Sequence, residues 1–161
     1  MPIVVDRFVI ATVTLVVAYL QTALPPRQTP GPELLDELVR AEERWQASKI
    51  KGYEFRFQYA CNGLIHIPPP DVPRGMLIRV KDGESMYLRP GAGPVPVAAE
   101  LVPYATVEKL FAFIRQAWTS RPVHMEVQYD QTRGFPIRVC VDPATVSDDE
   151  FGFLITDFSV L

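Results

Sequence analysis

The sequence predicts an α+β domain that follows an N-terminal transmembrane helix. Three observations support this: a charge-free apolar run near the N-terminus, two amphipathic helical stretches, and several runs in which apolar and polar residues alternate. The order of these patterns along the chain is α-β-β-β-α-β-β-β. Consecutive strands joined by short turns pair antiparallel, so we expect a largely antiparallel sheet with two helices packed on one face.

Residues 1–24 form the predicted membrane anchor or uncleaved signal segment. The run FVIATVTLVVAYL, from Phe8 to Leu20, carries no charge, and the residues up to Leu24 extend it to a short membrane span. Bulky residues precede Thr22-Ala23, so the small-x-small pattern of a signal cleavage site is missing, which favours a retained anchor. We therefore expect a single-pass membrane protein that contacts the lipid bilayer through Phe8 to Leu24.

A Pro-rich linker at residues 25–32 separates the anchor from the α+β domain, residues 33–161. Each of the two predicted helices has one apolar stripe, and Thr106 is a suitable N-cap for the second. The stripes are Leu34, Leu38, Ala41 and Trp45 in the first helix, and Val107, Phe111, Ile114 and Trp118 in the second. We expect Trp45, Trp118 and Phe111 to lie in the core.

Six strands are predicted from alternation of apolar and polar residues. Tyr53 to Tyr59 has one aromatic face, which we expect to be buried. Met76 to Lys81 and Glu84 to Leu88 flank Asp82-Gly83, a pair typical of a hairpin because both turn positions need positive φ. The apolar residues of the last three strands are Val123, Met125 and Val127, then Ile137, Val139 and Val141, then Phe151, Phe153 and Ile155.

Several segments of the domain resemble a known family. They are WQASKIKGYEFRFQYAC, VKDGE, TVEKLFAFI, VQYD with GFPIRVCVDP, and DDEFGFLITDF. Together they resemble the exported bacterial proteins catalogued as domain of unknown function 6174, from about Glu33 to the C-terminus. The resemblance implies a secreted or membrane-attached protein and implies no enzymatic activity. Because Arg7 and Arg27 nearly balance around the apolar run, the resemblance is what places the domain on the periplasmic or extracellular side of a bacterial membrane.

The two cysteines depart from the family pattern. Family members often carry Cys-x-Cys near the end of the first strand, whereas Cys61 is followed here by Asn62 and Gly63. Cys140 is an alternative partner for Cys61 in an oxidising compartment. Strand parity opposes that bond, because Cys140 alternates with Ile137 while Cys61 follows the buried aromatic face, and a disulfide needs converging Cβ vectors. We expect two separate, partly buried thiols.

Two sets of side chains have metal-ligand chemistry without metal-ligand spacing. The first, which zinc would accept, is Cys61, His66, His124 and Cys140. The second, which offers oxygens to calcium, is Asp130, Asp142, Asp148, Asp149 and Glu150. The first set matches no compact zinc motif, and the second lacks the alternation and central glycine of a calcium loop. We expect ordinary thiols, surface histidines and turn-capping carboxylates.

No constellation in the sequence demands an enzymatic reaction. Cys61 lies on an apolar strand face, where a thiol is normally inert, and prolines replace the N–H donors that a phosphate loop would need at Pro90 to Pro94. We therefore expect no catalytic, cofactor-binding or metal-binding residues. The formal net charge of -3 and pI near 5.4 leave no basic field, so nucleic acid is not an expected partner.

The expected function is that of a non-catalytic, membrane-anchored accessory or interaction subunit. It would dock onto a larger membrane protein complex, for example one of the respiratory or photosynthetic kind. The Pro-rich loops, Leu64 to Arg74 and Pro90 to Tyr104, are stiff and apolar enough to contact another protein. The alternative is a secreted periplasmic binding or inhibitor module that is released after signal cleavage.

Overall fold

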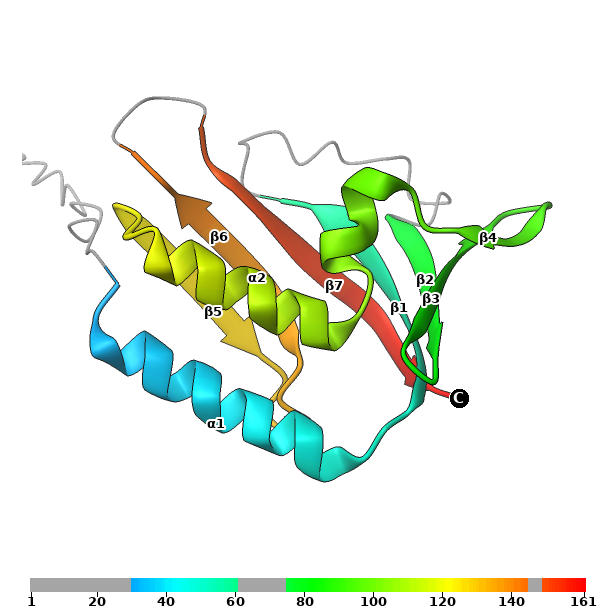
Figure 1. Ribbon diagram of the computed structural model, residues 1–161, viewed down its shortest axis with the longest axis horizontal. Helices are drawn as coiled ribbons and strands as arrows, with labels where there is room; N and C mark the ends of the chain where they lie inside the picture. The colour runs from blue at the N-terminus through cyan, green and yellow to red at the C-terminus, as the bar shows by residue number, and fades with distance from the viewer. Residues whose placement is uncertain (1–29, 61–74, 145–148) are drawn as a thin grey trace, which may run out of the picture.

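One antiparallel sheet organises the chain. The computed structural model describes residues 30–60, 75–144 and 149–161. Within these residues the sheet has seven strands in the order β4-β3-β2-β1-β7-β6-β5, and two α-helices lie across one of its faces (Figure 1). All neighbouring strands pair antiparallel. The prediction of an α+β domain with a largely antiparallel sheet is confirmed.

The predicted anchor, Phe8 to Leu24, lies outside the described residues. In the part of the chain that the structure does describe, no helix is long and apolar enough to cross a membrane. The anchor therefore stays a prediction from the sequence.

Both helices form where the apolar stripes predict them. Helix α1 (Pro32–Ser48) has proline in its first turn and ends at Lys49, which adopts left-handed backbone angles. Helix α2 (Val107–Thr119) starts after Thr106, whose hydroxyl accepts a hydrogen bond from the backbone N–H of Lys109 at 3.3 Å. The predicted N-cap is thus confirmed. The buried residues of the stripes are Leu38, Ala41 and Trp45 in α1, and Val107, Phe111 and Ile114 in α2.

The first three strands also follow the sequence closely. They are β1 (Gly52–Tyr59), β2 (Met76–Lys81) and β3 (Glu84–Arg89). In the turn between β2 and β3, Asp82 has φ 50° and Gly83 has φ 84°. Positive φ at both positions is the geometry that the Asp-Gly pair predicts, and it lets the hairpin keep the twist of its strands.

The Pro-rich segment from Pro90 to Tyr104 is more ordered than a loop, which corrects the predicted element order. It contains a seventh strand, β4 (Gly93–Pro96), and a 3-10 helix, η1 (Ala99–Tyr104). Among the described strands, β4 pairs with β3 alone and forms one edge of the sheet. Proline lacks an N–H donor and is tolerated at such an edge, so Pro94 and Pro96 do not prevent pairing.

The last three strands run from the second edge of the sheet, at β5, back to its middle, at β7. They are β5 (His124–Tyr129), β6 (Pro136–Asp142) and β7 (Phe151–Val160). β7 pairs with β1, so that Tyr53 faces Val160 and Tyr59 faces Phe153. This pairing joins the hairpin strands β1–β4 to the strands β5–β7 in a single sheet.

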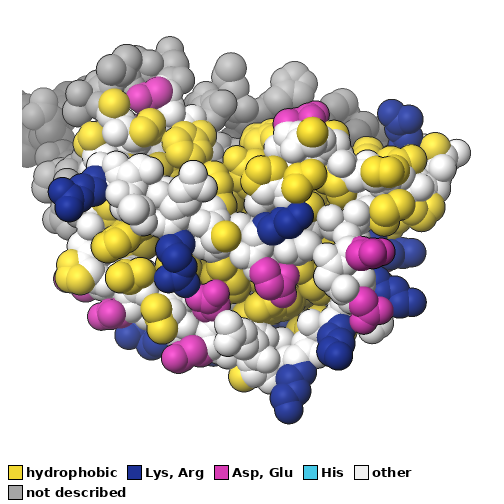
Figure 2. Space-filling model, viewed as in Figure 1, with side chains coloured by type: hydrophobic (Ala, Val, Ile, Leu, Met, Phe, Trp, Pro, Cys, Tyr) yellow, Lys and Arg dark blue, Asp and Glu magenta, His cyan; other side chains and the backbone are white. Residues whose placement is uncertain are grey.

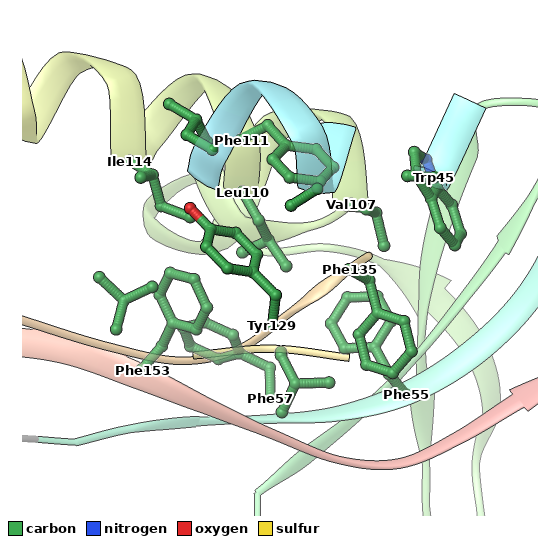
Figure 3. Close-up of a cluster of buried hydrophobic side chains, with 14 of the residues drawn as sticks. Trp45, Phe55, Phe57, Val107, Leu110, Phe111, Ile114, Tyr129, Phe135 and Phe153 are labelled. Carbon is green, nitrogen blue, oxygen red and sulfur yellow. The ribbon is translucent and has the colours of Figure 1, made fainter. Parts of the chain in front are cut away.

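The core lies between the sheet and the helices. Figure 3 shows Phe55, Phe57 and Phe153 of the sheet facing Leu110 and Ile114 of α2. At the margin of this layer, the expected burial of Trp118 and of Tyr59 is corrected. Trp118, in the last turn of α2, is only partly buried, and Tyr59 and Phe151 are 54% and 38% exposed.

A close contact fixes α1 against the turn between β5 and β6. Gly134 in that turn has φ 85°, and a Cβ atom there would collide with the backbone carbonyl of Ala41 in α1. Only glycine meets both conditions, because it has no Cβ and adopts positive φ readily. The position of α1 therefore depends on this residue.

We predict that Gly134→Ala destabilises the domain more than Gly91→Ala. Gly91 has a similar φ, 75°, but nothing within 4 Å of the position of a Cβ atom. Gly91→Ala should therefore lower stability only through the left-handed backbone conformation imposed on alanine, by about 1–2 kcal/mol. Gly134→Ala has the same cost and also loses about 1–3 kcal/mol because the new Cβ collides with α1. Urea unfolding of both variants measures the difference. Equal losses of stability would show that α1 does not press on the turn.

Candidate functional site

Two exposed and two partly buried aromatic side chains form a cluster at one end of the sheet. We call it the aromatic patch: Tyr59 at the end of β1, Tyr104 in η1, Phe113 in α2 and Phe151 at the start of β7. The ring centroids of Tyr59 and Tyr104 are 5.9 Å apart, those of Tyr104 and Phe113 5.0 Å, and those of Phe113 and Phe151 5.8 Å. Hydrophobic side chains also gather beside η1 in the space-filling view (Figure 2).

The aromatic patch is an extension of the core. Phe57 contacts both Tyr59 and Tyr104, and Phe153 contacts Tyr104 and Phe113, with all four centroid separations between 5.0 and 6.0 Å. Phe57 and Phe153 are themselves fully buried. Burial raises the pKa of Tyr59 and of Tyr104 above that of free tyrosine, which is itself neutral at physiological pH, and both hydroxyls are therefore uncharged. The result is an uncharged aromatic surface mounted on rigid elements.

A second feature lies in the seam between α1 and α2. The carboxylate of Glu108, in the first turn of α2, accepts a hydrogen bond from the indole N–H of Trp45 at 2.8 Å and from the hydroxyl of Tyr53 at 3.4 Å. The Tyr53 hydroxyl in turn accepts from the backbone N–H of Val107 at 2.9 Å. Residues from α1, β1 and α2 therefore hold this carboxylate in place.

Farther along the seam the two helices are joined by an ion pair between Arg115 of α2 and Glu42 of α1, at 2.5 Å. Beside the pair is a hollow of about 510 Å³. The hollow is open to solvent, and its lining, of which all but Glu42 is exposed, consists of Glu42, Glu108, Ala112, Arg115, Gln116, Thr119 and Ser120. Figure 2, which views this face of the molecule, shows acidic and basic side chains close together over the helices.

Two buried tyrosines stand beneath the seam in different surroundings. Burial is the main cause that raises the pKa of both Tyr53 and Tyr129 well above the ordinary value. The hydroxyl of Tyr53 is hydrogen-bonded, whereas that of Tyr129 has no hydrogen-bond partner among the residues that the structure describes. Figure 3 shows the Tyr129 hydroxyl pointing away from the sheet, toward the helices.

The structure describes only two of the four candidate zinc ligands. Cys61 and His66 lie outside the described residues, His124 begins β5, and Cys140 lies in β6. In residues 30–60, 75–144 and 149–161, no group of three or more His, Cys, Asp or Glu side chains has the arrangement of a metal site.

Cys140 is disulfide-bonded, so the expectation of two separate thiols is wrong for this residue. The sequence contains one other cysteine, Cys61, which lies outside the described residues. The argument from strand parity was wrong because the alternation of β1 does not continue to Cys61: the strand ends at Tyr59. Just beyond it, the backbone N–H of Ala60 bonds to Gly152, and Gly152 pairs with Cys140. The end of β1 is therefore close to Cys140 across a single strand.

Among the described residues, the candidate calcium ligands do not form a group of three or more that could hold a metal ion. Asp130 caps the turn after β5, where its carboxylate accepts from the backbone N–H groups of Thr132 and Arg133, and this is the role predicted for it. Asp142 is buried at the end of β6, and Asp149 and Glu150 immediately precede β7. Asp148 lies outside the described residues.

Comparison with known families identifies the chain. A family model described as a family of unknown function, DUF6174, matches residues 37–160. The chain belongs to this family. The match extends from the middle of α1 to the end of β7, so the resemblance found in the sequence is confirmed. No curated protein and no solved structure matches the chain.

Neither surface feature of this DUF6174 domain was found from its sequence. Alternation placed Tyr59 on a buried face, and Glu108 was not singled out. One feature of the sequence could have indicated that Tyr59 is exposed: it is the last residue of its strand and precedes a Pro-rich segment, so the helices are not expected to cover it. Glu108 offers no comparable signal, because its contact with Trp45 joins residues 63 positions apart.

We predict opposite effects from removing the two buried hydroxyls of the DUF6174 domain. Tyr53→Phe should lower the free energy of unfolding by about 1–2 kcal/mol, because it leaves the Val107 N–H without its acceptor. Tyr129→Phe removes a buried hydroxyl that lacks a partner in the described residues, so it should leave stability unchanged or raise it slightly. Urea unfolding of both variants tests the pair. A larger loss for Tyr129→Phe would contradict these assignments.

Proposed function

We propose that this DUF6174 protein is a non-catalytic, membrane-anchored accessory subunit whose domain docks onto a larger membrane protein complex. The observation that carries the proposal is the aromatic patch. Tyr59 and Phe151 are 54% and 38% exposed, yet both belong to a continuous aromatic network that reaches the core. Tyrosine and phenylalanine are enriched in the cores of protein interfaces, and rigid aromatic anchors lose little conformational entropy on binding.

The predicted anchor strengthens such docking without adding contacts. A domain tethered through residues 25–32 to a membrane helix at Phe8 to Leu24 shares the bilayer with its partner. Tethering by a short flexible linker gives effective concentrations on the order of millimolar, so a small interface is sufficient. Respiratory and photosynthetic complexes are candidate partners because they are large assemblies within membranes.

The proposed location is the periplasmic or extracellular side of a bacterial membrane. Cys140 supports it, because disulfides persist in oxidising compartments and are rare in the cytosol. The DUF6174 resemblance to exported proteins points to the same side.

Co-purification from native membranes tests the proposal. The tagged full-length chain would be extracted in mild detergent and separated by size, and its companions would be identified by mass spectrometry. We expect the wild-type chain to elute with one defined membrane complex. The double variant Tyr59→Ser/Phe151→Ser should bind that complex at least about tenfold more weakly. Each of the two side chains is expected to contribute about 1 kcal/mol of binding free energy, and a loss of about 1.4 kcal/mol corresponds to a tenfold lower affinity.

The matched control is Val39→Ser, which changes a 41% exposed apolar residue on α1, outside the aromatic patch. It should leave the association intact. A wild-type chain that always elutes alone would refute the accessory-subunit proposal. A mature chain that starts after Ala23 and is free of membrane would instead support the secreted binding or inhibitor module.

A further inference from the structure

The two edges of the sheet differ in how they are protected against further strand pairing. β4 forms one edge with only four residues, and two of them, Pro94 and Pro96, have no backbone N–H to donate. β5 forms the other edge with six residues, HMEVQY, which include no proline, glycine, lysine or arginine. Short strands, prolines and lysines are common means by which proteins prevent pairing at an edge. β5 has none of these three.

The backbone of β5 is regular. Among the described strands it pairs with β6 alone, and each residue from His124 to Tyr129 has a partner there. The irregularity in this pairing belongs to β6, because consecutive residues of β5 pair with Arg138 and Pro136. Ile137 between them is the extra residue. The outer N–H and C=O groups of β5 therefore form a continuous row, as a further strand requires.

The side chains of β5 alternate between an apolar and a polar face. Met125 and Tyr129 are buried on the side of the helices, and Val127 between them is partly buried. Glu126 and Gln128 are exposed on the other face, where the Gln128 amide donates to the Glu126 carboxylate at 2.8 Å. A strand added beside β5 would therefore meet an apolar side chain on one face and a carboxylate on the other.

Charge decides what kind of strand fits this edge. β5 has one acidic residue and no lysine or arginine. Helix α1, which contacts the turn after β5 at Gly134, has a surplus of acidic residues. They are Glu33, Asp36, Glu37, Glu42 and Glu43, against Arg40 and Arg44. A second copy of the chain fits poorly, because antiparallel pairing of two β5 strands keeps all helices on one face and brings two negative α1 helices together. A basic segment is the complementary occupant.

The edge at β5 is close to the aromatic patch. Val141 of β6 pairs with Phe151 on one side and with Met125 on the other. Neighbouring strands are about 4.8 Å apart, so the backbones of Phe151 and Met125 are separated by about 10 Å. A partner that covers the aromatic patch therefore also reaches the start of β5.

We propose that β5 receives an extended basic segment of the partner protein as an eighth strand of the sheet. This inference rests on the proposed accessory-subunit function and specifies the chemistry of the partner. The added segment alternates apolar residues, which lie beside Val127, with lysine or arginine residues, which lie beside Glu126. In this mode of recognition the main-chain hydrogen bonds supply affinity, and the alternating side chains supply specificity.

The test uses two synthetic peptides as probes and the backbone amide signals of β5 as the reporter. The first peptide, acetyl-TKVKVKT-amide, has valines on one face and lysines on the other. The second has the same side chains but is N-methylated at its three central residues, which removes their N–H donors. Each would be added to the ¹⁵N-labelled full-length chain in nonionic detergent. We expect the first peptide to cause saturable shifts that are largest in β5, and the second to bind at least about fivefold more weakly.

Glu126→Lys and Glu84→Lys form a matched pair of variants. Both change an exposed glutamate in a strand, but Glu84 begins β3, which is separated from β5 by four other strands. Glu126→Lys should weaken binding of the first peptide about fivefold, because like charges on directly opposite residues repel. Glu84→Lys should retain nearly wild-type affinity.

The proposal is overturned if no saturable shift occurs, if the shifts are no larger in β5 than in β4, if both peptides bind equally, or if both substitutions weaken binding equally. Co-purification tests the accessory-subunit function separately. A native complex in which the β5 amides exchange with solvent as fast as in the free chain would refute the added strand and leave that function standing. A chain that binds the first peptide but always purifies alone would refute the function and leave β5 as a binding edge.

Discussion

The pairing of β1 with β7 is the constraint on which the rest of the structure depends. β1 carries the buried residues Tyr53, Phe55 and Phe57, and β7 is the strand through which β5 and β6 join it. The pairing sets Tyr59 near the start of β7, which assembles the aromatic patch. It also fixes the strand from which Tyr53 reaches Glu108. Both the aromatic patch and the contact between Tyr53 and Glu108 are therefore positioned by one strand pair.

The sequence predicted the features that depend on neighbouring residues. The stripe of α1, the Thr106 cap and the hairpin at Asp82-Gly83 are all visible within a few positions, because helix periodicity, capping and positive φ are local properties. Alternation likewise gave the correct faces for Phe55 in β1 and Val139 in β6. Membership of the DUF6174 family followed from spaced segments and was confirmed, although the family brings no function with it.

What the sequence did not predict depends on contacts between distant residues. Nothing local indicates that β1 lies beside β7, and that pairing is what brings the end of β1 close to Cys140. β4 was missed because proline opposes strands in general but is tolerated at an edge. Tyr59 was placed in the core because alternation says which face a residue occupies and not how far the helices extend over it. The Trp45–Glu108 hydrogen bond was not predicted because it joins two residues that are 63 positions apart in the sequence.

Amide hydrogen exchange of the full-length chain tests the central role of the β1–β7 pair most directly. Amides that open only on global unfolding share the highest opening free energy in a protein, while peripheral units open at lower cost. We predict that the interior amides of β1 and β7 form that most protected group together, and that those of β4 exchange earlier. If β7 opened with β5 and β6 at a clearly lower free energy than β1, the two parts of the sheet would be separate units and the account would be contradicted.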